Sequence, residues 1–232
     1  MFGQNSTPLF EYDLKVCGEG GAVAGVDEAG RGSFAGPLVT AAVVFDYARF
    51  DSDMCRSLLS GLHDSKKLTA PTRSRLYPLI IRCSNQVSVA ISSNVSIDDN
   101  GIHRTNLSDL ERCVRMLSPC PELVLIDGYS LPDGSPCHRA VKGGDSLSAC
   151  IAAASVIAKV TRDRLMSRMH LLYPVYGFAK HFGYGTKAHR DAIAHHGFSP
   201  LHRRSFRTDS IFREPDGAPH GKQAGKKRSR RP

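Results

Sequence analysis

Residues 22–32, AVAGVDEAGRG, decide how this chain folds, because an apolar run ends in two acids followed by a glycine-rich turn. The apolar residues around the acids predict a buried strand over Ala22–Ala29. A second apolar run, Leu38–Phe45, predicts another strand after the turn. The two carboxylates, Asp27 and Glu28, therefore close the first of two strands that a sharp turn joins.

The residue types in this turn suit the binding of a metal ion and a phosphate. Carboxylates at a strand end attract hard cations, and the amides of Gly30 and Gly32 beside the cationic Arg31 suit a phosphodiester backbone. Consecutive strand residues point to opposite faces, so Asp27 and Glu28 share one site only if the strand ends or bends at Glu28. The stretch indicates a metal-dependent enzyme that acts on nucleic acid.

The remaining pattern predicts an α/β layer fold without internal repeats. Helical spacing of apolar residues marks the helices, and Pro78 is expected to kink or shorten one of them. Alternating or continuous apolar runs mark the strands. The predicted helices span residues 70–83, 105–117, 147–169 and 187–196, and the further strands span 86–92, 122–128 and 140–141.

Two further acids are candidates because of where they stand in this pattern. Asp127 ends a short apolar run with the composition of a buried parallel strand, and Asp145 precedes the long helix. Sites collect at the carboxyl ends of strands, and a neighbouring antiparallel strand would bring Asp27 beside Asp127. Such a cluster of like charges needs divalent cations. Two alternatives stay open: Asp145 caps the helix, or Asp127 and Gly128 form an ordinary turn.

Composition and charge limit the class of protein. The chain of 232 residues is 41% hydrophobic, enough for one substantial core, and has a net charge of +9. Residues 217–232 hold six lysines and arginines and no acid, so the rest is only mildly basic. Residues 207–232 are predicted to form a disordered basic tail, either inert or a non-specific phosphate-binding arm. The polar N-terminus and the lack of a long apolar run predict a cytoplasmic protein without membrane contact.

Cysteines and histidines do not predict a metal site. The seven cysteines form no C-x-x-C pair, which favours buried thiols over disulfides or thiolate zinc. The ten histidines lack metal-ligand spacing. Gly30-x-Gly32-x-x-Ala35 matches a dinucleotide fingerprint, but a predicted strand follows where that motif needs a helix. Oxygen ligands remain, which fit hard cations and argue against zinc.

Several longer motifs follow one another along the chain: Gly25–Gly32, Asp64–Leu68, Leu125–Gly128, Ala152–Asp163, Tyr176–Phe178 and His202–Phe206. In this order they resemble the ribonuclease HII family. The resemblance implies an RNase H-like fold, in which helices flank a mixed sheet and the C-terminal part is helical. We expect one catalytic domain over residues 1–206, of which the first 20 residues lie outside the resemblance.

The resemblance also implies an activity. Members hydrolyse the RNA strand of RNA–DNA hybrids and incise 5′ of single ribonucleotides in duplex DNA, leaving 3′-hydroxyl and 5′-phosphate ends. Two Mn²⁺ or Mg²⁺ ions would be held by four catalytic carboxylates, here Asp27, Glu28, Asp127 and Asp145. The candidate substrate-binding residues are Gly30, Arg31, Gly32, Lys66 and Tyr184.

Each substrate-binding candidate has an expected role. The backbone of Gly30 and Gly32 would read the 2′-hydroxyl, and Arg31 would bind phosphate. Tyr184 would pack on the next deoxyribose at an RNA–DNA junction. Lys66 is either a phosphate contact or part of a solvated lysine pair with Lys67.

Two positions depart from the family pattern. An extra glycine before Asp145 displaces Lys142 from its usual place, which leaves the role of Lys142 undecided. Gly185 stands where many relatives carry proline, which is expected to loosen the loop of Tyr184.

Two alternative functions stay open: a sister nuclease such as ribonuclease HIII, and a non-catalytic basic module that only binds nucleic acid. The protein is expected to act as a monomer on hybrids and on ribonucleotide-containing duplex DNA. A replication or repair protein is the kind of protein partner considered.

Overall fold

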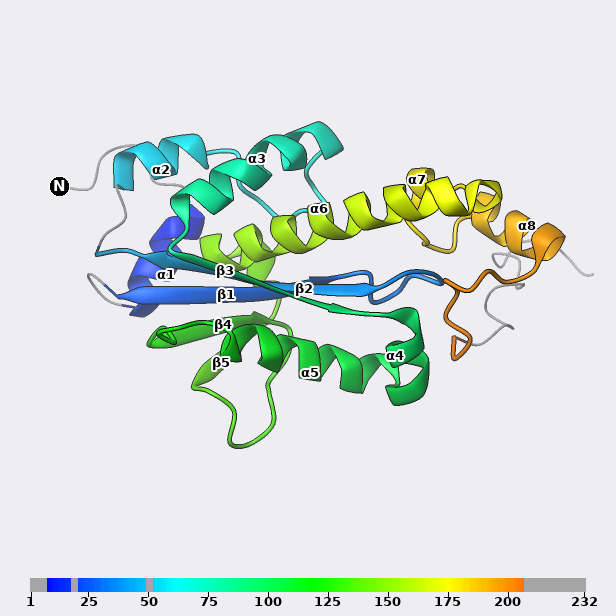
Figure 1. Cartoon of the computed structure of the whole chain (residues 1–232). Helices are drawn as coiled ribbons and strands as arrows, with labels where there is room; N and C mark the ends of the chain where they lie inside the picture. The colour runs from blue at the N-terminus through cyan, green and yellow to red at the C-terminus, as the bar shows by residue number, and fades with distance from the viewer. Residues whose placement is uncertain (1–7, 18–20, 49–51, 207–232) are drawn as a thin grey trace, which may run out of the picture.

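The computed structural model describes residues 8–17, 21–48 and 52–206, and its centre is a mixed five-stranded sheet in the order β3-β2-β1-β4-β5 (Figure 1). The strands are β1 (Ala22–Ala29), β2 (Leu38–Asp46), β3 (Gln86–Ser92), β4 (Leu123–Asp127) and β5 (His138–Val141). The central strand β1 runs antiparallel to β2 and parallel to β4. The expectation of an antiparallel neighbour that brings Asp27 beside Asp127 is therefore wrong, because both acids lie at the carboxyl ends of parallel strands.

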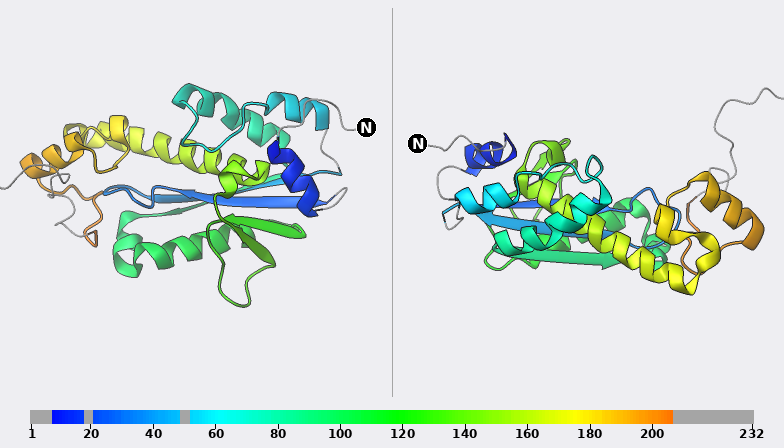
Figure 2. Two further views of the ribbon diagram at one scale, coloured as in Figure 1. Left: turned by 180° about the vertical axis from the view of Figure 1, so that it is seen from behind. Right: turned by 90° about the horizontal axis from the view of Figure 1, so that it is seen from above.

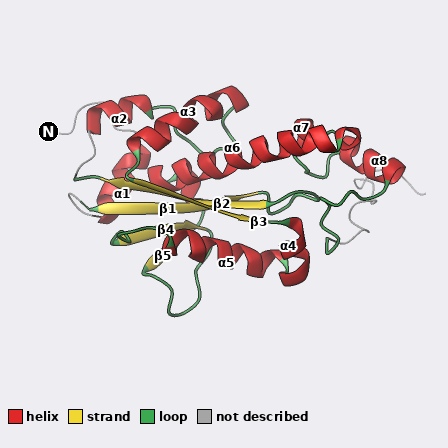
Figure 3. Ribbon diagram, in the orientation of Figure 1, coloured by secondary structure: helices red, strands yellow, loops and turns green. Residues whose placement is uncertain are grey.

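Helices cover both faces of this sheet (Figures 1 and 3). The long helix α6 crosses one face together with α1, α2 and α3, and α4 and α5 cover the other. The helices are α1 (Pro8–Cys17), α2 (Ser52–Leu58), α3 (Ala70–Cys83), α4 (Asn94–Asn100), α5 (Ile102–Arg115), α6 (Ala149–Leu172), α7 (Phe178–His181) and α8 (Lys187–His196), with 3₁₀ turns η1 (Gly144–Ser146) and η2 (Pro174–Tyr176).

Most predicted elements are confirmed, and several have the predicted bounds. These are β1, β3, α3 and α8. Pro78 lies inside α3, but the helix continues to Cys83, so the expected shortening does not occur. The helices α1, α2, α4 and α7 were not predicted, because each is short and its apolar residues are too few to show a clear period.

A close contact between β1 and α6 sets the position of the long helix. A Cβ atom on Gly25 would lie 2.1 Å from the main-chain carbon of Cys150, so only glycine allows this approach. Asp13 of α1 accepts a hydrogen bond from the main-chain N–H of Cys150 at 2.9 Å and so binds the first turn of α6. The N-terminus of α6, and the acid just before it, are thereby fixed against the strand that carries Asp27.

The segment after α6 forms a small C-terminal layer that extends beyond the sheet (Figure 2). Its core contains Phe178, stacked on Tyr176, and the buried rings of His181, His189 and His202. This confirms the expected helical C-terminal part.

Buried histidines in this layer make stability depend on pH. Burial lowers the pKa of His189 and of His202 to about 4. The unfolded chain therefore binds more protons between pH 6.5 and 4, and the stabilisation present above pH 6.5 is lost as the pH falls through this window. We expect the stability advantage of the wild type over His202→Asn to shrink by roughly 1 kcal/mol between pH 7 and pH 5.

This prediction is checked by denaturant unfolding of both proteins at pH 7, 6 and 5. The comparison matters because burial raises the pKa of Asp27 and Glu28, which gives the opposite slope in the same window. That contribution is common to both proteins and cancels in the difference. A difference that stays constant with pH would contradict the assignment.

The described residues bear on two further expectations. None of their helices is long and apolar enough to cross a membrane. Four of the cysteines in them are buried: Cys55, Cys83, Cys113 and Cys150. The predicted disordered tail, residues 207–232, lies outside the described residues.

Candidate active site

Three carboxylates meet at the carboxyl ends of two parallel strands. Asp27 lies on β1, and Asp127 ends β4, where the register pairs Val26 with Ile126 one residue earlier. Asp145 joins them: each of the three acids contributes one carboxylate oxygen, and these three oxygens all lie within 4.8 Å of one another. The structure thus brings together three of the four predicted acids, although Asp27 precedes Asp127 by 100 residues in the sequence.

Asp145 reaches this cluster because the chain turns tightly before α6. Gly143 has a left-handed backbone with φ +66°, and the N–H of Gly144 donates to Asp127 Oδ1 at 2.8 Å. Asp145 follows in the 3₁₀ turn η1, and Ser148 caps α6 through its hydroxyl. The alternative that Asp145 caps the helix is therefore wrong.

Glu28 lies apart from the three clustered acids. β1 continues through Glu28 to Ala29, paired with β2 throughout, so the strand does not end or break at Glu28 as a site shared by both acids would require. Glu28 instead points toward the opposite face, 3.9 Å from the guanidinium of Arg31. Its Oε2 atom is buried without a hydrogen-bond partner. Glu28 therefore lies at the border of the cluster, with one carboxylate oxygen near Arg31 and the other without a hydrogen-bond partner.

Asn106 of α5 lies beside Glu28 and was missed by sequence reasoning. Its side chain is fully buried, and its hydrogen bond to Glu28 lowers the pKa of that acid. A buried amide is costly unless it is paired, so Asn106 marks this as a polar site. The signal in the sequence was a polar residue beside Thr105 and Leu110 on the buried side of a helix.

The acids strongly perturb one another. Burial raises the pKa of Asp27 well above its usual range, and the charges of Glu28 and Asp127 raise it further. Burial also raises the pKa of Asp145, and it raises the pKa of Glu28 to about 7. Carboxylates this close and this buried require positive charge to ionise together. An all-oxygen donor set fits a hard divalent cation such as Mg²⁺ or Mn²⁺.

Lys66 supplies part of that positive charge. Its Nζ atom lies 3.7 Å from Asp145 Oδ2, on a side chain that is 75% exposed. Burial lowers the pKa of Lys66, but the charges of Asp27 and Asp145 outweigh this and leave the pKa raised. Lys67 instead contacts Ser146 Oγ at 3.5 Å, and Lys142 is exposed on the turn before η1. Of the two adjacent lysines, Lys66 is the one at the acids.

Two buried arginines hold the glycine-rich turn, and sequence reasoning missed both. Arg162 of α6 and Arg203 are among the largest fully buried side chains of the described residues. Arg162 donates hydrogen bonds to Ser33 Oγ and to the carbonyls of Ala35, Pro37 and Phe182, and Arg203 donates to the carbonyls of Arg31 and Gly36. The sequence held a signal for Arg162, because helical spacing places it between Ala158 and Met166 on the buried face.

Arg162 connects the turn to the loop of Tyr184. The Tyr184 ring is half-buried, with Arg162 Cζ 5.3 Å and Lys159 Nζ 5.5 Å from its centroid. A Cβ atom on Gly185 would lie 2.3 Å from the ring of Phe34. The expectation that Gly185 loosens this loop is therefore wrong, because the glycine lets the loop pack closely against Phe34.

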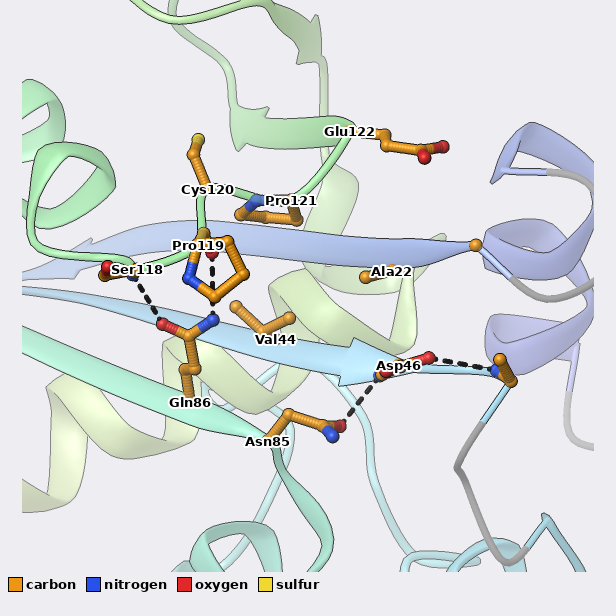
Figure 4. Close-up of a pocket in the computed structure, with 12 residues that line it drawn as sticks. Ala22, Val44, Asp46, Asn85, Gln86, Ser118, Pro119, Cys120, Pro121 and Glu122 are labelled. Atoms are coloured by element: carbon orange, nitrogen blue, oxygen red, sulfur yellow. Dashed lines mark hydrogen bonds between the residues drawn. The ribbon is translucent and has the colours of Figure 1, made fainter.

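A separate cavity of about 580 Å³ lies at the opposite end of the sheet (Figure 4). It is lined by the start of β1 and β3, the end of β2 and the segment before β4. Gln86 spans it, accepting from the N–H of Ser118 at 2.8 Å and donating to the carbonyl of Pro119 at 3.0 Å. None of the clustered acids lines this cavity, so it is not part of the candidate active site.

A mixed sheet with acids at adjacent strand ends, and a basic, glycine-rich turn beside them, defines an RNase H-like, metal-dependent nuclease. A solved structure of the ribonuclease H2 from Pyrococcus horikoshii OT3 matches it with a TM-score of 0.68 and 26% sequence identity, covering 82% of this chain and 96% of that one.

Sequence comparisons identify the family. The family model for ribonuclease HII matches residues 24–209. The chain is 50% identical to a ribonuclease HII of Mycobacterium ulcerans over 186 residues, 80% of this chain and 75% of that one. It is 48% identical to one of Rhizobium meliloti over 206 residues, 88% of this chain and 91% of that one. The chain belongs to the ribonuclease HII family.

Membership establishes the reaction. The protein is an endoribonuclease that hydrolyses the RNA strand of RNA–DNA hybrids and incises 5′ of single ribonucleotides in duplex DNA, with Mn²⁺ or Mg²⁺ as cofactor. This excludes the non-catalytic binding module and favours ribonuclease HII over the sister type.

Proposed function

We propose that Asp27, Asp127 and Asp145 are the catalytic metal ligands, with Glu28 as the fourth catalytic acid. The observation that carries the proposal is the cluster of three carboxylate oxygens within 4.8 Å. When bound, the metal ions supply an acidified water nucleophile and neutralise charge on the leaving oxygen. The buried, unpartnered Oε2 of Glu28 supports its assignment, because it leaves an acceptor free beside the cluster.

The substrate-binding roles are proposed from position and exposure. Gly32 is exposed at the tip of the turn, where its backbone could approach a ribose 2′-hydroxyl without a side chain in the way. Arg31 is partly exposed between Glu28 and the ring of Tyr129, which suits a phosphate contact. Lys66 beside Asp145 suits a second phosphate contact.

Incision at a single ribonucleotide tests the assignment of the function to this site. A DNA duplex that carries one ribonucleotide is incubated with the protein and Mg²⁺, Mn²⁺ or EDTA, and the cut is mapped. We expect a cut 5′ of the ribonucleotide with either metal ion and none with EDTA. Cleavage confined to long hybrids would instead support a ribonuclease HIII-like specificity.

Tyr184 is proposed to read the RNA–DNA junction by packing on the deoxyribose that follows the ribonucleotide. We expect Tyr184→Ala to lower incision at a single ribonucleotide at least about tenfold more than cleavage of a long hybrid. Steady-state rates on both substrates check this. Tyr184→Phe serves as the control, because it keeps the ring, and equal loss on both substrates would remove the junction role.

Partners and location are proposals as well. The catalytic acids all come from one chain, which supports action as a monomer. A relative from Archaeoglobus fulgidus was solved as a PCNA:RNase HII complex, at 28% identity and a TM-score of 0.64. That structure supports a protein partner of this kind, and the cytoplasmic location stays a prediction.

A further inference from the structure

Three buried histidine rings lie in contact directly behind the loop of Tyr184. His189 of α8 and His202 are almost fully buried, with ring centroids 5.2 Å apart. His181 of α7 stacks on His189 at 4.4 Å between centroids. The metal ligands proposed above do not include these residues, so their burial and mutual contact need another explanation.

The hydrogen bonds of two of these histidines define which nitrogen carries each proton. The main-chain N–H of Ser199 donates to His202 Nδ1 at 2.9 Å, so the proton of a neutral His202 lies on Nε2. His202 Nε2 is 3.1 Å from His189 Nε2 and therefore donates to it. His189 then carries its own proton on Nδ1, which donates to the carbonyl of Tyr184 at 3.0 Å.

Both rings are neutral, as this arrangement requires, because burial lowers the pKa of His189 and of His202 to about 4. The result is a one-way chain of hydrogen bonds from the N–H of Ser199 through two imidazoles to the backbone of Tyr184. The loop that receives it is otherwise held in unusual conformations, with φ +50° at Phe182 and φ +81° at Gly183. A fixed donor at its centre would keep such a loop in one conformation.

We infer that His189 and His202 are positioning residues for the junction preference: their hydrogen bonds hold the backbone of Tyr184 so that its ring meets the deoxyribose in one orientation. The inference rests on the junction role of Tyr184 proposed above. A misplacement of a recognition group by about 1 Å is enough to lower a rate a hundredfold, so a single backbone hydrogen bond can control the preference.

Two substitutions at one position separate this role from simple packing. His189→Asn places an amide nitrogen near the position of Nδ1, so it can still donate to the carbonyl of Tyr184. His189→Gln extends its amide toward the position of Nε2, so it can pair with His202 but leaves that carbonyl only the main-chain N–H of Thr186, at 2.8 Å, as a donor. Both variants lose the imidazole ring and its stacking on His181, so their difference reports the hydrogen bond.

The experiment measures kcat and KM of the full-length variants on a duplex with one ribonucleotide and on a long RNA–DNA hybrid. We expect His189→Gln to lose at least about tenfold in kcat on the single ribonucleotide while hybrid cleavage changes less than about threefold. His189→Asn should keep the wild-type ratio of the two rates. Equal ratios in the two variants would overturn the inference.

Tyr184→Ala, assayed in parallel, separates failure of this inference from failure of the proposed junction role. If Tyr184→Ala loses junction preference and His189→Gln does not, only the positioning role is wrong. If Tyr184→Ala lowers both rates equally, the junction role is wrong, and the inference that rests on it is wrong as well.

Histidine NMR of the wild-type protein tests the tautomers even if the variants fail to fold. We expect ¹⁵N shifts that place the proton on Nδ1 of His189 and on Nε2 of His202. The opposite tautomers would overturn the inference, because the chain of hydrogen bonds could not then run toward Tyr184.

Discussion

Asp127→Asn is expected to abolish cleavage of both substrates while leaving the folded structure and hybrid binding intact. The substitution removes one of the three carboxylates within 4.8 Å but keeps an oxygen that can accept the N–H of Gly144. Loss of a metal ligand removes several kcal/mol of transition-state stabilisation, so we expect a fall in kcat on the order of a thousandfold or more. Single-turnover cleavage with saturating Mg²⁺ measures it.

Stability and binding provide the controls for this variant. Removing one of several repelling charges should leave the melting temperature equal or higher in the absence of metal, and hybrid affinity equal or tighter. Turnover within tenfold of wild type would remove Asp127 from the site. A large loss of stability would mean that the carboxylate is structural.

Gly30→Ala is expected to disable the enzyme through the fold of the turn. Gly30 has φ +98°, and an added Cβ atom would lie 2.0 Å from Arg162 Nε. Arg162 is buried and hydrogen-bonded on several sides, so it can move only by giving up its contacts with the turn and with Phe182. We expect destabilisation of about 2–4 kcal/mol and a loss of activity on the order of a hundredfold.

Gly32→Ala is the matched control, two residues away in the same turn. Nothing lies within 4 Å of the Cβ position at Gly32, so the free protein should unfold within about 0.5 kcal/mol of wild type. Denaturant unfolding and KM distinguish the two variants: Gly30→Ala loses stability, and Gly32→Ala weakens substrate approach alone. Equal stability of both variants would contradict the packing of Arg162 under Gly30.

The sequence was sufficient to predict the strands and the acids Asp27 and Asp127 at their ends, because both depend on local pattern. An apolar run predicts a strand, and an acid at its end predicts a polar edge, so Asp27 and Asp127 could be found without knowing the partner strands. The direction of β1 relative to β4 could not be predicted in this way. Strand pairing depends on the crossover through helices rather than on the residues of either strand.

The position of Glu28 shows a second limit. The alternation of side chains along a strand correctly raised the question of how adjacent acids share a site. The alternation could not decide whether the strand bends at Glu28, because the two glycines that follow permit a bend. In the structure, β1 stays paired with β2 and does not bend there. Asn106 and the histidines behind Tyr184 were missed because their roles arise only from contacts between distant segments.

The way Arg162 and Arg203 hold the turn has a consequence for how this region can vary. Nearly all of their acceptors are main-chain carbonyls, which every amino acid possesses, rather than side chains. Apart from Ser33, whose hydroxyl accepts from Arg162, side chains in residues 31–37 can therefore be exchanged, where space allows, without removing the bonds that shape the turn. A library randomised at Phe34 alone should retain more active clones than one randomised at either arginine, since the shape of the turn is encoded at a distance from the turn itself.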